Sequence, residues 1–245
     1  MPEAIFSRLT PLYSKAALEA FASARVAVIG VGGVGSWTAE ALVRNGIRHV
    51  TLIDSDEVEV TNINRQLQAL HSTVGTPKVK ALGERLLDIN PELDLRMLVE
   101  RVLPETVDDI LTDVDIVLDC IDSIDDKAAL IACAKKKNLA IYTSGGAGGK
   151  LNPDSIAVAD LALTTDDPLL ASVRRELRHR YGFPAQGASK SKSLFGVKAV
   201  YCAEPMKVNP EASSNRMFGT AVFMTATFGM RLAAELLNDL ADKAL

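Results

Sequence analysis

A glycine-rich turn after a short β-rich run is the feature that most constrains the fold. Residues 25–29 form that run, and a helical pattern of apolar residues covers 34–42. Gly30, Gly32 and Gly33 lie between these two segments, and Gly35 lies near the start of the second. Glycines at this spacing permit a tight turn, close approach of backbone N–H groups to a phosphate, and close packing of helix on strand. Because a helix N-terminus attracts anions, the segment predicts a nucleotide-binding βαβ unit.

The remaining apolar segments favour an α/β fold. A helix is expected from Thr76-Pro77 to Asn90, and another over 127–137. Further strands are expected at 49–54, 93–99, 114–121, 139–143, 155–161 and 198–204. Alternating strands and helices predict a doubly wound, mostly parallel, Rossmann-like sheet, to which the last two strands add an antiparallel C-terminal extension. With 245 residues and no clear linker, we expect a single domain over 1–245 whose nucleotide-binding half is about 25–150.

Composition excludes several classes of protein. Hydrophobic residues make up 48% and charged residues 24%, which is ordinary for a globular chain. The three cysteines, Cys120, Cys133 and Cys202, include no Cys-x-x-Cys pair, so neither a disulfide framework nor a thiolate zinc site is expected. The N-terminus does not have the pattern of a signal peptide, and the apolar stretch over 217–230 is too short to span a bilayer. We therefore expect a cytoplasmic protein that does not enter a membrane, and a buried helix at 217–230.

Polar residues beyond the glycine turn narrow the class of nucleotide. Asp54 ends the second expected strand, where a carboxylate can accept ribose hydroxyls, and on its own this pattern indicates a nicotinamide dehydrogenase. Arg65 and Lys78 argue against a dehydrogenase and favour a triphosphate ligand, because the β- and γ-phosphates need cations and a dehydrogenase has no need for these two. Asn62 can bind phosphate or ribose without adding charge. Asp122 follows the fourth expected strand at the carboxyl edge of the sheet, where a carboxylate suits Mg²⁺.

Taken together, these segments resemble the adenylating family of ubiquitin-activating enzymes and their bacterial relatives in molybdopterin and thiamine synthesis. The matching segments are the glycine run, Asp54-x-Asp56, Asn62-x-Asn64-Arg65-Gln66, Gly75-x-Pro77-Lys78 and Asp119-Cys120-x-Asp122. The resemblance covers residues 25 to about 149. It implies attack of a carboxylate on the α-phosphorus of ATP, which gives an acyl-adenylate and pyrophosphate.

The same resemblance implies roles for individual residues. Asp54 binds ribose, and Asp56 is either its neighbour at the ribose or an acid at the entry to the helix. Arg65, Lys78 and Asp122 are the candidate catalytic residues, with Asp122 also the candidate Mg²⁺ ligand. The candidate nucleotide-binding residues are Gly30, Gly32, Gly33, Gly35, Asp54, Asp56, Asn62, Arg65, Gln66, Lys78 and Arg8. Arg8 matches an arginine that relatives send to the γ-phosphate from a second protomer, which implies a homodimer. A monovalent cation is left open as a further cofactor.

The second substrate is less constrained by this part of the chain. Relatives that pass the acyl group to sulfur use a cysteine after the glycine-rich loop, and residues 152–199 contain none. A lasting thioester is therefore not expected, which argues against a ubiquitin-like acceptor. Since relatives without such a cysteine also adenylate proteins of that kind, an activator of a ubiquitin-like sulfur carrier stays open as the alternative.

A local excess of positive charge marks the last third of the chain. Between residues 172 and 200, seven Lys and Arg residues stand against one Glu, whereas the whole chain has a net charge of −4. Such a run is most often a solvated helix face. The more specific hypothesis is that it binds an RNA backbone. The candidate RNA-binding residues are Arg174, Arg175, Arg178, Lys190 and Lys192.

Over most of its length the chain resembles the branch of this family that dehydrates threonylcarbamoyladenosine in tRNA, including the segments Ser144–Lys150 and Tyr201–Pro205. That resemblance implies adenylation of the threonyl carboxylate, followed by attack of the carbamoyl nitrogen and release of AMP, with no enzyme thiol. Residues 151–245 would then face the tRNA and the dimer partner. A cysteine desulfurase with its sulfur-acceptor protein stays open as a partner. A non-catalytic tRNA- or partner-binding module stays open as the function.

Overall fold

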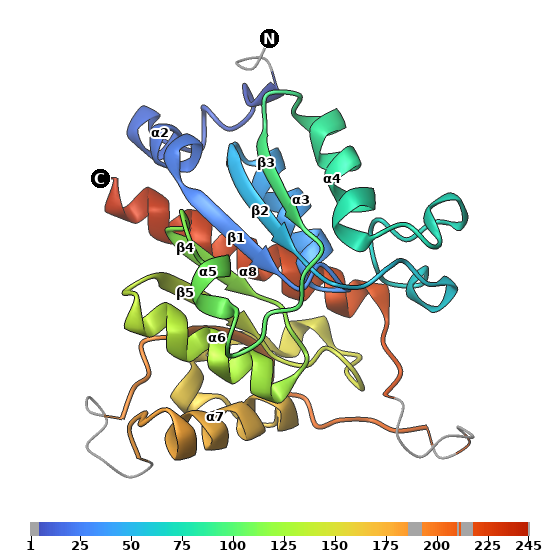
Figure 1. Cartoon of the computed structure of the whole chain (residues 1–245), viewed down its shortest axis with the longest axis vertical. Coiled ribbons are helices and arrows are strands. Elements are labelled where there is room, and N and C mark those ends of the chain that lie inside the picture. The colour runs from blue at the N-terminus through green and yellow to red at the C-terminus, as the bar shows by residue number, and fades with distance from the viewer. Residues whose placement is uncertain (1–4, 186–192, 210, 212–217, 245) are drawn as a thin grey trace.

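The computed structural model describes residues 5–185, 193–209, 211 and 218–244. Seven strands form one sheet in the order β3-β2-β1-β4-β5-β7-β6 (Figure 1). The strands are β1 Arg25–Ile29, β2 His49–Ile53, β3 Asp94–Leu98, β4 Ile116–Asp119, β5 Ala140–Ser144, β6 Ile156–Asp160 and β7 Lys198–Cys202. Neighbouring strands run parallel except β6 and β7, which are antiparallel. The mostly parallel sheet with an antiparallel C-terminal addition is therefore confirmed.

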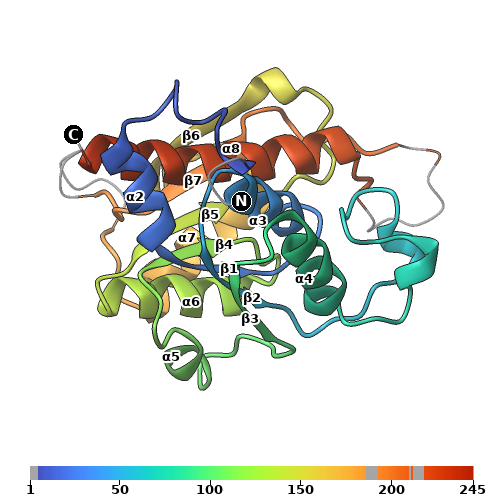
Figure 2. The same ribbon diagram turned by 90° about the horizontal axis from the view of Figure 1, so that it is seen from above.

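Helices cover both faces of this sheet (Figure 2). One face is covered by α2 Lys15–Ser23, α3 Gly35–Arg44, α4 Lys78–Ile89 and α8 Val222–Lys243. The other face is covered by α5 Val107–Ile110, α6 Ile124–Lys136 and α7 Pro168–Arg180. Short 3-10 helices lie at η1 Val60–Asn62, η2 His71–Thr73, η3 Pro153–Ser155 and η4 Leu161–Leu163.

The central strand β1 shows why the sheet is buried on both faces. Val26 and Val28 belong to the core under α3 and α8, whereas Ala27 and Ile29 belong to the core under α6 and α7. Successive side chains of a strand point to opposite faces, so a strand covered on both sides needs an almost unbroken apolar run. This is the pattern that marks residues 25–29 in the sequence.

Two helices differ from their expected form. The helix expected over 127–137 begins earlier, at Ile124, directly after Ser123 as its N-cap. The helix expected over 217–230 begins at Val222 and extends to Lys243. It is amphipathic instead of fully buried, because Phe228 and Leu232 are buried while Phe223 and Met230 are exposed. None of the helices in the described part of the chain has the length and hydropathy to span a bilayer.

The strand order places a crevice at one edge of the sheet. From β1 the chain builds outward to β2 and β3 on one side, and then returns to place β4 and β5 on the other. The loops after β1 and β4 consequently diverge at the carboxyl edge. Ligands of open α/β sheets bind at such a reversal point.

Candidate active site

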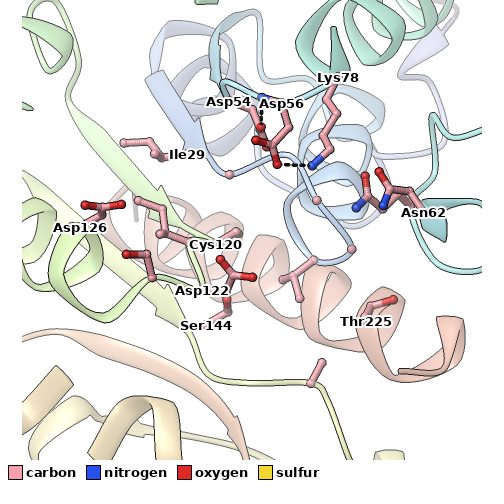
Figure 3. A pocket seen from close by; sticks show the side chains of 18 of the residues that line it. Ile29, Asp54, Asp56, Asn62, Lys78, Cys120, Asp122, Asp126, Ser144 and Thr225 are labelled. Carbon is pink, nitrogen blue, oxygen red and sulfur yellow. Dashed lines mark hydrogen bonds and ion pairs between the residues drawn. The ribbon is translucent and has the colours of Figure 1, made fainter. Parts of the chain in front are cut away.

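The crevice after β1 and β4 is a cavity of about 890 Å³. It brings together most of the residues that the sequence singled out. Lining it are Gly30, Gly32, Gly33, Asp54, Asp56, Asn62, Arg65, Gln66, Lys78 and Asp122. Gly35 lies behind this wall as the first residue of α3, and Arg8 is exposed on the N-terminal segment outside the cavity. In Figure 3, Asp54, Asp56 and Lys78 gather on one side of the cavity, and Asp122 and Ser144 lie across from them.

The glycine turn is packed tightly on one side and open on the other. Gly30 has φ +81°, and a Cβ there would lie 2.9 Å from the carbonyl oxygen of Cys120. A Cβ on Gly35 would lie 1.9 Å from the carbonyl oxygen of Gly30. A Cβ on Gly32, by contrast, would meet only Gln66 Nε2, at 3.8 Å. Gly30 and Gly35 therefore serve the packing of strand and helix, whereas Gly32 leaves room at the cavity for a ligand.

Asp54 is tied to the glycine turn that it faces. The Val31 N–H donates to Asp54 Oδ2 at 2.8 Å, and the Asp56 N–H donates to Oδ1 at 2.9 Å. Burial raises the pKa of Asp54, and the nearby charge of Lys78 opposes that shift. Each carboxylate oxygen can accept a second hydrogen bond, which is what the two hydroxyls of a ribose would supply.

The two candidate phosphate cations are held in different ways. Lys78 Nζ lies 2.7 Å from Asp56 Oδ2, so its charge is paired within the cavity wall. Arg65 donates to neutral acceptors, the Thr61 carbonyl at 2.8 Å and Asn64 Oδ1 at 3.0 Å. Its guanidinium is therefore held by neutral acceptors and has no carboxylate partner among the described residues.

Two amide side chains complete this wall. Asn62 is buried and ties down its own turn, because its Oδ1 accepts the Glu59 N–H at 3.1 Å. Gln66 is also buried, and its Oε1 has no hydrogen-bond partner among the described residues. A buried polar atom without a partner at the edge of a cavity is a place where a ligand donor would be stabilised.

Asp122 is carried by a short segment that a buried ion pair stiffens. Lys127 Nζ lies 2.9 Å from Asp119 Oδ2 and donates to the Ile121 carbonyl at 2.8 Å. Thr143 Oγ1 donates to the same Asp119 oxygen at 2.7 Å. Sequence reasoning missed the roles of Asp119 and Lys127. The available signal was an acidic residue at a strand end followed eight residues later by a lysine that directly precedes the apolar run 128–131 of a helix.

Cys120 also lines the cavity. Burial raises the pKa of its thiol to about 12, so the sulfur carries a proton at neutral pH. A protonated thiol is a poor nucleophile. The half-buried Cys120 therefore serves packing beside the glycine turn and not nucleophilic attack.

The basic run falls largely on α7, and its arginines are not equivalent. Arg174 is half-buried and donates to Thr164 Oγ1. Arg178 donates to the Pro184 carbonyl at 3.1 Å and lies 5.2 Å from the ring centre of Phe195. Arg175 is exposed, while Lys190 and Lys192 lie outside the described residues. The structure does not bring α7 arginines into the cavity lining, which α7 reaches through Leu169.

Comparison with known proteins agrees with this arrangement. The model of the ThiF family matches residues 6–241. A tRNA threonylcarbamoyladenosine dehydratase of Haemophilus influenzae is 40% identical over 249 aligned residues, which cover 97% of this chain and 94% of that protein. Crystal structures of the Escherichia coli tRNA threonylcarbamoyladenosine dehydratase TcdA with AMP and with ATP are 40% identical and superpose with TM-scores of 0.92 and 0.91. Each match covers 99% of this chain and 96% of the other chain. The chain belongs to the ThiF family.

Proposed function

We propose that the protein is an ATP-dependent dehydratase of threonylcarbamoyladenosine in tRNA. One observation carries the proposal: the glycine turn, Asp54, Arg65, Lys78 and Asp122 line a single cavity at the reversal point of the sheet. The relatives that match nearly the whole chain have that name, and one of them has been crystallised with ATP and with AMP.

The proposed reaction uses the cavity to position ATP and to neutralise its charge. Asp54 holds the ribose, and the backbone N–H groups near Gly32 approach the phosphates. The threonyl carboxylate attacks the α-phosphorus, and pyrophosphate leaves with its negative charge facing Arg65 and Lys78. The carbamoyl nitrogen then attacks the acyl carbon and AMP leaves, so the nucleoside loses one water in total. Positioning and charge neutralisation supply most of the catalysis in such a transfer.

Mg²⁺ is part of this proposal, with Asp122 as its protein ligand. Asp122 is an exposed carboxylate that lines the same cavity as the candidate phosphate residues. Mg²⁺ is commonly held by one or two carboxylates together with substrate phosphates and water. The Asp122 carboxylate, in the same cavity as the candidate phosphate residues, fits this mode of binding. When bound, the ion would stabilise negative charge on the phosphates.

The division of the chain and its partners complete the proposal. Residues 25–150 form the nucleotide half, and residues 151–245 face the tRNA, with Arg174, Arg175, Arg178, Lys190 and Lys192 as candidate contacts. The protein acts as a homodimer in the cytoplasm, and Arg8 reaches the γ-phosphate of the partner's ATP. The exposed position of Arg8 outside its own cavity supports this, as do the exposed apolar residues Val222, Phe223 and Met230 on α8.

The test is to incubate the protein with ATP and tRNA that contains threonylcarbamoyladenosine, and to weigh the nucleosides by mass spectrometry. We expect loss of one water in the wild type and a fall of about 100-fold or more in rate for Arg65→Ala, since a lost contact to a charged group costs about 1.5–3 kcal/mol and Arg65 offers two such contacts. Arg96→Ala, at an exposed arginine on β3, is the matched control. An unchanged nucleoside with pyrophosphate released only when a ubiquitin-like protein is added would overturn the proposal in favour of a sulfur-carrier activator.

A further inference from the structure

One buried carboxylate links the wall of the cavity to the helix that carries the basic residues. Asp167 is 3% exposed and is the N-cap of α7, where its Oδ1 accepts the Leu170 N–H at 2.9 Å. Its Oδ2 accepts the Gly146 N–H, also at 2.9 Å. Gly146 lines the cavity, so the two oxygens of one side chain join two segments that are 21 residues apart.

The glycine loop after β5 is shaped around this carboxylate. A Cβ on Gly145 would lie 2.0 Å from Asp167 Oδ2, so only glycine at that position lets the carboxylate reach the loop. The Gly145 N–H donates to the Val200 carbonyl of β7 at 2.8 Å, which fixes the loop on its other side. The wall at Gly145 and Gly146 is therefore held between β7 and the start of α7.

The turn that leads into Asp167 is fixed as well. Lys150 is fully buried, and its Nζ donates to the Asp166 carbonyl at 2.9 Å and to the Cys202 carbonyl at 3.2 Å. Asp166 has φ +54°, a conformation that a non-glycine residue rarely adopts without support. Both ends of the glycine loop, at Gly146 and at Lys150, are thus bonded to the two residues before α7.

We propose that Asp167 is a positioning residue that holds the Gly145–Gly146 wall of the cavity in a fixed position relative to α7. This inference rests on the proposed function, in which α7 belongs to the tRNA-facing half and the cavity holds ATP. A tRNA held along α7 then presents its threonyl carboxylate at a fixed place relative to the α-phosphorus. Asp167 is outside the Asp54 and Lys78 side of the cavity, so it acts on alignment and not on nucleotide affinity.

The variant Asp167→Asn separates this role from that of a helix cap. Asn and Asp are about equally good N-caps, so the side-chain oxygen continues to accept from Leu170. The new amide nitrogen then faces the Gly146 N–H, donor against donor, and the link to the loop is lost. Asp160→Asn is the matched control: Asp160 caps η4 and accepts from Gly196 N–H at 2.7 Å, but it lies at the other edge of the sheet.

We expect kcat for dehydration of tRNA to fall about tenfold or more in Asp167→Asn, the equivalent of one hydrogen bond to a charged group. The affinities for AMP, by calorimetry, and for tRNA, by gel shift, should stay within about twofold, since the contacts to both are untouched. Asp160→Asn should keep the wild-type kcat even if its melting temperature falls. If Asp167→Asn does not fold, Gly145→Ala gives the same test, because the added methyl displaces the carboxylate without removing it.

The inference would be overturned by a wild-type kcat in Asp167→Asn or Gly145→Ala, or by an equal loss of kcat in Asp160→Asn. A fall in AMP affinity of Asp167→Asn as large as the fall in kcat would do so too, since it would indicate general damage to the site. Failure of the proposed function looks different, because the wild-type protein itself would then leave the nucleoside unchanged.

Discussion

Two alanine substitutions three residues apart in the glycine turn should impair different properties of the protein. Gly32→Ala should weaken ATP binding, and Gly35→Ala should destabilise the fold. Neither Gly32 nor Gly35 has a positive φ, so alanine is allowed at both positions by the backbone itself. What differs is the space around the added methyl group. At Gly35 it would lie 1.9 Å from the Gly30 carbonyl oxygen, and at Gly32 the nearest atom is 3.8 Å away.

The magnitudes follow from these distances. In Gly35→Ala, α3 must move away from the turn, and overpacking of this kind costs about 1–3 kcal/mol. For a chain of this size, each kcal/mol lowers the melting temperature by about 2–4 °C. In Gly32→Ala the fold is spared, and a less flexible unfolded chain adds about 0.4–1 kcal/mol of stability. The methyl group instead blocks one backbone N–H from a phosphate oxygen, a loss of about 1.5–3 kcal/mol, or about 10- to 150-fold in affinity.

Calorimetry with ATP and a thermal melt of both variants give the test. We expect Gly32→Ala to melt at or slightly above the wild-type temperature and to bind ATP at least about tenfold more weakly. Gly35→Ala should melt several degrees lower, whatever its affinity. Wild-type affinity in Gly32→Ala would refute phosphate binding at this turn, and a wild-type melt of Gly35→Ala would refute the packing of α3 derived from it.

Three further substitutions test other parts of the site. Cys120→Ser should keep the dehydratase rate within about threefold, because a thiol whose pKa is raised to about 12 carries a proton during turnover; loss of activity, or an ATP-dependent thioester in mass spectra, would contradict this. Arg175→Glu should weaken tRNA binding and reduce the slope of log affinity against log salt by about 1, and an unaltered slope would make Arg175 a solvated surface residue. Glu204→Gln should make the free energy of unfolding depend less on pH under acidic conditions. The Lys207 ammonium lowers the pKa of Glu204 to about 2. The stabilisation by Glu204 is therefore complete above the ordinary pKa of 4.5 and is lost as the pH falls toward 2. Urea unfolding at several acidic pH values checks this, with the exposed Glu92→Gln as control.

The parts of the fold that can be predicted from sequence are those with a local cause. Buried parallel strands need apolar runs, and β1 and β4 are therefore recognisable from the amino-acid sequence alone. The glycine turn and Asp54 are recognisable because their chemistry lies within one βαβ unit. Arg65 and Lys78 follow from the residue types that come after the second strand, and they line the cavity together.

The parts that could not be predicted depend on contacts between distant segments. Lys127 is expected from the sequence only as the start of a helix, yet it is buried against Asp119, and burial of such a pair is decided by the packing of α6 on the sheet. The bond from Gly146 to Asp167 has the same origin. A count of charges along α7 could not show that Arg174 is half-buried while Arg175 is exposed. The apolar residues of α8 predict burial, but no described part of the chain covers the face with Phe223 and Met230.

The order of the strands connects the two sides of the cavity to different parts of the chain. β7 comes from the C-terminal half but pairs directly with β5, between β5 and β6. The glycine loop after β5 is consequently bonded to later elements, through Gly145 to Val200 and through Lys150 to Cys202. The wall opposite Asp54 and Lys78 includes this glycine loop and is therefore bonded to elements of residues 151–245, whereas the glycine turn, Asp54 and Lys78 lie within residues 25–78. We infer that changes in the later elements can move this wall of the cavity while the glycine turn stays as it is.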